Sequence, residues 1–168
     1  KDLHNLKFLI APRHPQRCKD VEQIVSRFGF RAVLISELSS ECSTCIAKPV
    51  FILDTVGELI SFYRIADIVF VGGSLIKKGG HNILEPASLA KPILFGPYMF
   101  NFRDIADLFL SNRAAKMVFN QEELKTNIVD VLNNPSEAIE LGQRALQLIL
   151  ANQGATKRNV EYIRNYGN

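Results

Sequence analysis

An apolar run that opens into a glycine-rich loop constrains this chain more than any other feature. The run at residues 67–71 (DIVFV) leads into GGSLIKKGGHNILEP at residues 72–86. A strand that ends in a small-residue loop and opens a helix is suited to bind a phosphate, because the amides at the helix start face the ligand and the helix dipole favours an anion. Glu85 repels phosphate but suits hydroxyl groups such as those of a ribose. The pattern therefore predicts a site for a nucleotide or a nucleotide sugar.

Length and composition fit one globular domain with a substantial core. The chain has 168 residues, of which 47% are hydrophobic and 22% charged, and its net charge of +3 is too balanced to indicate a nucleic-acid-binding protein. No apolar run approaches the length of a membrane span. The chain does not begin with Met, so we expect it to be part of a longer protein.

The three cysteines, Cys18, Cys42 and Cys45, are few and odd in number, which suits a reducing compartment. Cys42 and Cys45 have the spacing of half a zinc site or of a redox pair. No second pair exists and the histidines lie far away in the sequence, so incidental loop cysteines are the favoured interpretation. We predict no metal site.

Short apolar segments alternate with amphipathic ones along the whole chain. The patterns predict strands at 6–11, 31–35, 50–53, 68–71, 92–95 and 115–119, and helices at 20–28, 59–65, 82–90, 102–110, 121–132, 136–151 and 156–166. This alternation predicts an α/β fold with a parallel sheet and helices on both faces. Ligands bind such sheets at the carboxyl ends of the strands, and the loops after Ala11, Leu53 and Val71 lie there.

Two of these loops carry candidate binding residues of several kinds. Residues 12–17 (PRHPQR) combine rigid prolines with two guanidinium groups, which suit a phosphate or a carboxylate, although a surface turn with solvated arginines is the alternative. Residues 54–59 (DTVGEL) form a strand-to-helix turn whose amides can bind a base or a phosphate. Thr55 and Glu58 also fit a capping box with Thr55 as N-cap. The cap is the favoured role on local evidence, and the two roles can coexist.

The third loop, with GGHN at 79–82 and Glu85, is the strongest candidate. Asn82 is expected as the N-cap of the following helix, with Glu85 three residues on. Capping alone does not explain four glycines in nine residues, since glycine in a loop costs folding entropy. We therefore favour a ligand site. The P-loop, GxGxxG, DxD and GxSxG motifs are all missing from the sequence.

PRHPQR, DTVGEL and the long run GGSLIKKGGHNILEPASLAKPILFGPYMFNF at 72–102 resemble the 3-deoxy-D-manno-octulosonic acid (Kdo) transferases of lipopolysaccharide synthesis, over nearly the whole chain. The resemblance implies the C-terminal, Rossmann-like half of a two-domain GT-B glycosyltransferase. Residues 1–168 would form its single CMP-sugar-binding domain, without the N-terminal acceptor domain. The family transfers Kdo from CMP-Kdo to the lipid A precursor (lipid IVA), with inversion and without a metal or other cofactor. The resemblance places the full-length protein at the cytoplasmic face of the bacterial inner membrane and implies that this fragment is soluble.

Carried over by position, the resemblance implies CMP contacts from Pro12, Arg13, Val56, Gly57, Glu58, Asn82, Ile83, Leu84 and Glu85, with His14, Gly73, Ser74, Gly80 and His81 as additional candidates. Arg13 would neutralise the phosphate, the amides of Gly57 and Asn82 would bind it or the base, and Glu85 would hold the ribose hydroxyls.

Four positions depart from the family pattern: Gln16 replaces a usual Glu, Lys77 and Lys78 charge a loop that is often less charged, and Ile83 replaces a common Pro. None of these removes a proposed contact. For the lysine pair, a solvated loop tip is favoured over contact with the donor carboxylate or an acidic acceptor.

The family's catalytic base, acceptor-binding residues and membrane anchor belong to the other half, so we expect no catalytic residue here and no turnover by this fragment alone. The implied partners are CMP-Kdo, the lipid A precursor through the missing domain, and the membrane surface, but no nucleic acid. Two other functions stay open. One is half of another GT-B enzyme that uses a UDP or GDP sugar, although a diphosphate should need more anion contacts. The other is a non-catalytic nucleotide-binding module.

Overall fold

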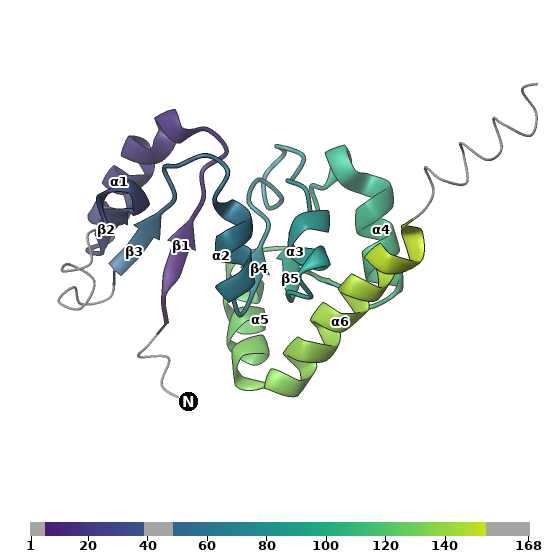
Figure 1. Cartoon of the computed structure of the whole chain (residues 1–168). Coiled ribbons are helices and arrows are strands. Elements are labelled where there is room, and N and C mark those ends of the chain that lie inside the picture. Colours follow the sequence, from purple (N-terminus) through teal and green to yellow (C-terminus); the bar gives the residue numbers. More distant parts are fainter. Residues whose placement is uncertain (1–5, 39–48, 154–168) are drawn as a thin grey trace, which may run out of the picture. The chain divides into compact units, whose positions relative to one another are not determined.

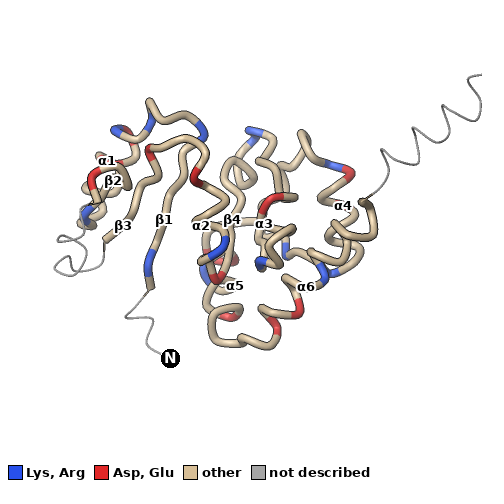
Figure 2. Tube along the Cα trace, in the orientation of Figure 1, with Lys and Arg blue, Asp and Glu red and all other residues tan. Residues whose placement is uncertain are grey.

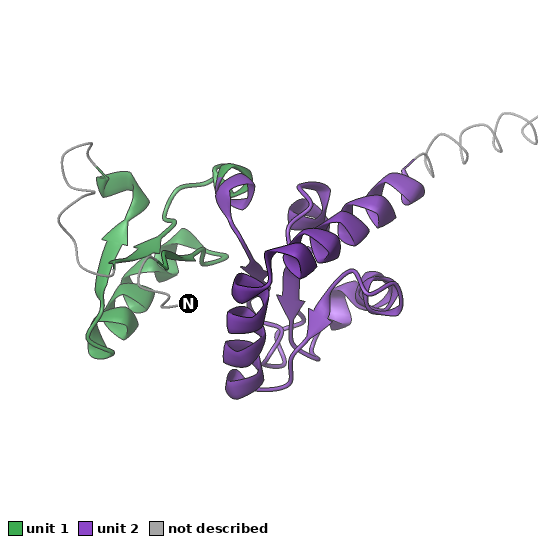
Figure 3. Cartoon of the chain, turned by 90° about the horizontal axis from the view of Figure 1, so that it is seen from below, with its two compact units in different colours: residues 1–61 green, residues 62–168 purple. Residues whose placement is uncertain are grey.

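The computed structural model describes residues 6–38 and 49–153. The chain divides into two compact units, residues 1–61 (unit 1) and residues 62–168 (unit 2) (Figure 3). Both units combine parallel strands with helices (Figure 1), which confirms the predicted α/β class. The helix predicted at 156–166 and the pair Cys42 and Cys45 lie outside the described residues.

Unit 1 is built on a three-stranded parallel sheet with the strand order β1-β3-β2. Its strands are β1 (Phe8–Ile10), β2 (Arg31–Leu34) and β3 (Pro49–Ile52). α1 (Cys18–Arg27) follows the 3₁₀ turn η1 (Pro15–Arg17) and packs on β2 and β3, and η2 (Ile35–Glu37) follows β2. Ile10 and Leu34 both pair with Ile52 of the central strand. The carboxyl ends of the three strands therefore share one edge of the sheet.

Unit 2 contains a second three-stranded parallel sheet, with the order β4-β5-β6. Its strands are β4 (Val69–Phe70), β5 (Ile93–Phe95) and β6 (Lys116–Met117). The helices are α3 (Leu84–Ser88), α4 (Arg103–Ser111) after the 3₁₀ turn η3 (Phe100–Phe102), α5 (Gln121–Asn133) and α6 (Pro135–Asn152). α2 (Leu59–Ile65) contains the boundary between the two units.

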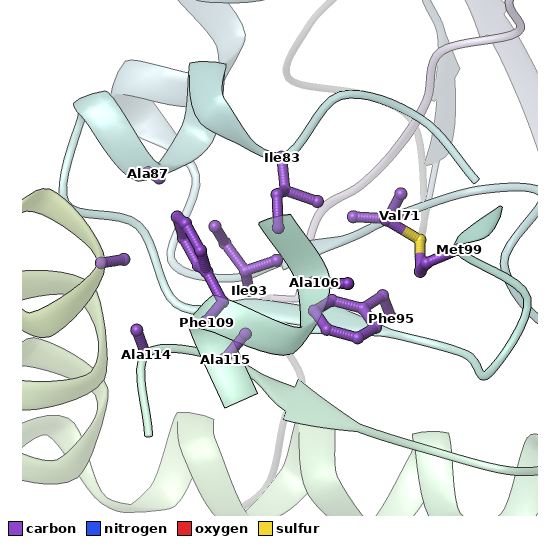
Figure 4. Close-up of a cluster of buried hydrophobic side chains, with 11 residues drawn as sticks. Val71, Ile83, Ala87, Ile93, Phe95, Met99, Ala106, Phe109, Ala114 and Ala115 are labelled. Carbon is purple, nitrogen blue, oxygen red and sulfur yellow. The ribbon is translucent and has the colours of Figure 1, made fainter. Parts of the chain in front are cut away.

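β5 is the centre of the core of unit 2. Ile93, Leu94 and Phe95 are all at most 1% exposed. Because successive residues of a strand point to opposite faces, burial of all three means that both faces of the sheet are covered. On one face, Ile93 and Phe95 pack with side chains from α3, α4 and α6, as Figure 4 shows for most of the cluster.

α3 ends in a tight turn that packs against α6. Ala90 has φ 54°, in the left-handed region, and the amide of Lys91 donates to the carbonyl of Pro86 at 3.1 Å. This 6→1 bond is the pattern of a Schellman helix end, although glycine usually occupies the left-handed position. A Cβ on Gly142 of α6 would overlap the carbonyl oxygen of Ala90. The contact between α3 and α6 therefore depends on the missing side chain of Gly142.

Gly142→Ala is expected to destabilise the protein, even though alanine favours a helix over glycine by about 1 kcal/mol. The added methyl group meets a backbone carbonyl, and overpacking of this kind costs about 1–3 kcal/mol. Urea unfolding followed by circular dichroism measures the free energy of unfolding. The neighbouring exposed residue of α6 supplies the control, because Gln143→Ala should leave that free energy unchanged or slightly higher. A Gly142→Ala protein more stable than its parent would contradict the close approach of α3 and α6.

Candidate functional site

In unit 1, the loops after β1 and β3 leave the same edge of the sheet. The amide of Leu53 donates to the carbonyl of Ile10 at 2.9 Å, which extends the ladder between the two strands by one residue. Pro12 is half-buried directly beyond this point, and Arg13 and His14 are exposed. The structure therefore brings the predicted PRHPQR and DTVGEL segments together at the carboxyl ends of adjacent strands, where α/β sheets bind ligands.

A carboxylate clamp joins the loops after β2 and β3. The hydroxyl of Ser36 donates to one oxygen of Asp54 at 2.5 Å, and the amide of Ser36 donates to the other oxygen at 3.0 Å. The Ser36 hydroxyl is the main reason why the pKa of Asp54 lies below its ordinary value of 3.8, since hydrogen bonds to the charged form favour it. The clamp orients the start of the DTVGEL turn.

Cys18 anchors the start of α1 to the same turn. Its thiol lies 3.8 Å from the carbonyl oxygen of Leu53, and the residue is buried. Burial, and secondarily the charge of Asp54, raise the pKa of the Cys18 thiol. A thiol with a raised pKa is a poor nucleophile, so Cys18 acts here as a packed side chain.

The prediction that Thr55 is the N-cap of the next helix is wrong. α2 begins at Leu59, four residues after Thr55, and the Thr55 hydroxyl donates to the carboxylate of Glu58 instead of accepting from its amide. The reason is Gly57, whose φ of 90° takes the backbone into the left-handed region before the helix starts. As a result Val56, Gly57 and Glu58 form an exposed turn.

In unit 2, two loops leave the carboxyl edge of the sheet and are bonded to each other. We call residues 72–80 and 96–101 the double loop. The fully buried hydroxyl of Ser74 donates to the carbonyl of Val71 at 2.5 Å and accepts from the amide of Gly96 at 2.7 Å. The carbonyl of Ser74 also accepts from the amide of Tyr98 at 2.8 Å. Ser74, an additional site candidate, thus uses its hydroxyl to hold the loops together.

Two of the loop's glycines have a structural reason for being glycine. Gly79 and Gly80 have φ values of 87° and 68°, in the left-handed region. A Cβ on Gly79 would overlap the side chain of Asn101, and one on Gly80 would overlap the sulfur of Met99. The loop therefore needs these glycines in order to pack against residues 96–101. In the sequence, this partner loop is marked by Gly96 and Pro97 directly after a strand and by its place within the motif at 72–102.

The segment from His81 to Glu85 joins the double loop to α3. His81 is half-buried, with its ring beside Gly72 and Gly73. The side-chain oxygen of Asn82 accepts from the amide of Leu84 at 3.0 Å, but the N-cap of α3 is Ile83. The helix begins one residue later than predicted, so Asn82 lies just before the N-cap position and still bonds to the first turn. The predicted capping box with Glu85 is therefore wrong in its register.

Burial separates the residues of this segment into two groups. Ile83 is fully buried and points into the core cluster (Figure 4), so only its backbone faces the loop. Leu84 is exposed and Glu85 is half-buried on α3. Burial, and secondarily the charge of Glu85, raise the pKa of Tyr63 to about 12. The negative charge of Glu85 thus acts on the Tyr63 hydroxyl. Glu85 follows His81 and Asn82 in the segment that leads from the double loop into α3.

The part of the chain that the structure describes holds neither a metal-binding cluster nor a membrane-spanning helix. No cluster of three or more His, Cys, Asp or Glu residues within residues 6–38 and 49–153 is arranged to hold a metal ion. Among the same residues, no helix has the length and apolar character needed to cross a bilayer.

Comparison with known proteins gives consistent matches, although no family profile matches the chain. A 3-deoxy-D-manno-octulosonic acid transferase of Haemophilus influenzae is 34% identical over 165 residues, which is 96% of this chain and 38% of the relative. The corresponding transferase of Rickettsia conorii is 36% identical over 86% of this chain and 31% of its own length. The chain thus spans well under half the length of these curated relatives.

A solved structure matches both the fold and the sequence. The C-terminal CMP-Kdo binding domain of WaaA from Acinetobacter baumannii superposes with a TM-score of 0.76 and 31% identity, over 84% of this chain and 72% of that domain. The parallel α/β fold and these relatives place the chain among the glycosyltransferases. The chain belongs to the Kdo transferase family, which confirms the resemblance recognised in its motifs.

We expect Ser74→Ala to lower the free energy of unfolding by about 1–3 kcal/mol, because the buried amide of Gly96 then loses its acceptor. Chemical denaturation measures the change. Ser88→Ala is a matched control, since that exposed hydroxyl donates to the carbonyl of Glu85 at 2.7 Å and its removal should cost less than about 0.5 kcal/mol. Equal losses in the two variants would contradict a special role for Ser74.

Ser36→Ala should destabilise the protein more at neutral than at acid pH. Because the folded pKa of Asp54 is lowered from 3.8, its contribution to stability is complete above that value and is lost as the pH falls through the folded pKa. The free energies of unfolding of parent and variant, measured from about pH 7 down to about pH 3, should therefore converge. Ser26→Ala, an exposed change in α1, is expected to give an offset that does not vary with pH. A constant offset for Ser36→Ala would rule out the clamp.

Proposed function

We propose that this chain is the donor-binding half of a Kdo transferase and that it binds CMP-Kdo through its strand-end loops. The observation that carries the proposal is the 31% identity and TM-score of 0.76 to a domain described as CMP-Kdo binding. The placement of the candidate residues at the carboxyl edges of the two parallel sheets supports it, because α/β proteins bind nucleotides there.

The proposed contacts follow from the chemistry of each residue. Arg13 is exposed beyond β1 and can offer a planar fork of donors to the CMP phosphate. The exposed turn at Gly57 and the segment at Asn82 offer backbone amides to the phosphate or the base. Glu85 is half-buried, and its carboxylate can accept hydrogen bonds from two ribose hydroxyls. α3 has only five residues, so its dipole contributes little.

Exposed apolar side chains next to these groups suit the flat faces of the nucleoside. Val56 is 85% exposed and Leu84 is 36% exposed. We propose that they cover the base or sugar, while Pro12, Glu58 and the backbone of Ile83 complete the contacts. His14, Gly73, Gly80 and His81 are additional positions at the same edges. In this proposal residues 1–168 form one CMP-sugar-binding domain.

The full-length protein would transfer Kdo from CMP-Kdo to lipid IVA, with inversion and without a metal, at the cytoplasmic face of the inner membrane. The catalytic base and the acceptor site would come from the other half, since a base must lie within hydrogen-bond reach of the attacking hydroxyl. This chain alone would then bind donor and turn over nothing.

Glu85→Ala is expected to weaken CMP binding about ten- to hundredfold, because the ribose hydroxyls lose their hydrogen bonds to a charged carboxylate. Arg13→Ala should cause a loss of similar size that shrinks at high salt, because the lost contact is ionic. Isothermal titration calorimetry with CMP measures both. Glu122→Ala and Arg27→Ala, which remove exposed charges on α5 and α1, are the matched controls and should bind CMP like the parent. Unchanged affinity in Glu85→Ala would refute its ribose-binding role.

A titration with CMP, UMP, GMP and AMP tests the class of donor. We expect CMP to bind best, and a preference for UMP or GMP would point to another sugar nucleotide. The full-length protein assayed with CMP-Kdo then tests transfer. Nucleotide binding without any transfer by the full-length protein would identify a non-catalytic module.

A further inference from the structure

One tyrosine of α2 lies near the proposed ribose-binding carboxylate, although it belongs to none of the three motifs. Tyr63 lies between the motifs at 54–59 and 72–102. It is on the packed face of its helix, because positions 62, 63 and 66 are half-buried, whereas positions 60, 61, 64 and 65 are exposed. The part of α2 from Phe62 onward belongs to unit 2, as does α3. Tyr63 and Glu85 are therefore parts of the same compact unit.

A hydrogen bond ties the last turn of α2 to the chain that leaves α3. The ammonium group of Lys91, three residues after α3 ends at Ser88, donates to the carbonyl oxygen of Arg64 at 2.7 Å. Tyr63 directly precedes that carbonyl group in the sequence. A helical side chain leans toward the N-terminus of its helix, so the Tyr63 hydroxyl lies over the turn before Arg64. The bond thus holds the backbone of Tyr63 beside the segment that contains α3.

The charge of Glu85 shows that the carboxylate and the Tyr63 hydroxyl are neighbours. Glu85 is the only charged residue of α3, and Figure 2 shows this acidic position on the helix in red. Burial, and secondarily the charge of Glu85, raise the pKa of Tyr63 to about 12, because both disfavour a phenolate. The phenol therefore keeps its proton at neutral pH and presents a hydrogen-bond donor close to a group that only accepts.

A donor next to an acceptor matches the chemistry of a sugar hydroxyl. Each hydroxyl donates one hydrogen bond and also carries lone pairs that accept. A carboxylate can take the proton of the ribose hydroxyl but offers nothing to its lone pairs, so Glu85 alone satisfies half of the group. Tyr63 can supply the missing donor. Its half-buried ring is ordered before the ligand arrives, which reduces the entropy lost on binding.

We propose that Tyr63 is a further donor-binding residue, whose hydroxyl donates a hydrogen bond to a ribose hydroxyl that Glu85 accepts from. Together the two side chains select a ribonucleotide over a nucleotide that lacks the sugar hydroxyls. The inference rests on the proposed function, and in particular on the ribose-binding role of Glu85. In a purely structural role, Tyr63 would pack α2 and its hydroxyl would contact only water.

Titration of Tyr63→Phe with two nucleotides tests the proposal. The substitution keeps the ring and removes only the hydroxyl. We expect CMP to bind about three- to tenfold more weakly, the effect of one net hydrogen bond. The dideoxy analogue of CMP lacks both ribose hydroxyls, so it should bind Tyr63→Phe and the parent equally. Isothermal titration calorimetry measures all four affinities. A loss confined to CMP distinguishes a contact with the ribose from a change in packing, which would weaken both ligands.

Tyr98→Phe is the matched control, because Tyr98 is the other tyrosine in the described part of the chain and is half-buried as well. This variant should bind CMP and the dideoxy analogue like the parent. Circular dichroism of Tyr63→Phe should match the parent spectrum, since the ring that packs on unit 2 is retained.

A double-mutant cycle tests whether Tyr63 and Glu85 hold the same group. Residues that share a partner have non-additive effects. In a Glu85→Ala background, Tyr63→Phe should therefore weaken CMP binding clearly less than it does in the parent. An equal loss in the two backgrounds would overturn the shared contact.

The outcomes separate this proposal from the one on which it rests. A parent without affinity for CMP would overturn both. If the parent binds CMP and Glu85→Ala weakens that binding, while Tyr63→Phe binds CMP as tightly as the parent, only the assignment of Tyr63 is wrong. Equal losses of Tyr63→Phe for CMP and for the dideoxy analogue would also overturn the assignment, because they would identify a packing role.

Discussion

The architecture of unit 2 depends most on the two hydrogen bonds that the Ser74 hydroxyl makes. This hydroxyl is fully buried, donates to the carbonyl of Val71 and accepts from the amide of Gly96. One small side chain thus bonds the ends of two adjacent parallel strands, where the ladder stops and each chain must turn away. A glycine-rich loop has much conformational entropy to lose, and this buried pair of hydrogen bonds opposes that loss. The positions of Gly79, Asn82 and Glu85 follow from the loop that it holds.

In unit 1, a carboxylate holds together the loops that leave adjacent strand ends. Parallel strands in register bring Ile10, Leu34 and Ile52 to one edge, so the following loops crowd together there. Asp54 accepts both the hydroxyl and the amide of Ser36 and thereby ties the loop after β3 to the one after β2. Each unit therefore combines a polar clamp close to the sheet with more exposed residues farther out, where we propose that the donor binds. This division explains how a site can be both ordered and open.

The elements and the family could be predicted from the sequence, whereas the roles of single residues within the loops were predicted less well. The run from Ile93 to Phe95 is apolar throughout because both faces of β5 are covered, and this apolar run predicted the strand correctly. The cap assigned to Thr55 was wrong because Gly57 adopts a left-handed conformation, which delays the helix. The cap assigned to Asn82 was one residue out of register. A helix cap forms only when several consecutive backbone angles take the right values. A pattern of residues specifies the side chains and does not fix those angles, so the caps were predicted less well than the helices.

By itself, the sequence determined the alternation of strands and helices and the motifs that assign the chain to the Kdo transferases, since both are written in the order of residues along the chain. Tertiary structure alone decided which loop residues serve the fold. It placed Ile83 in the core, set Gly142 against the turn at Ala90, and joined residues 72–80 to residues 96–101. Those roles depend on contacts between residues far apart in the sequence, and a side chain is buried or exposed only after its distant neighbours have packed around it.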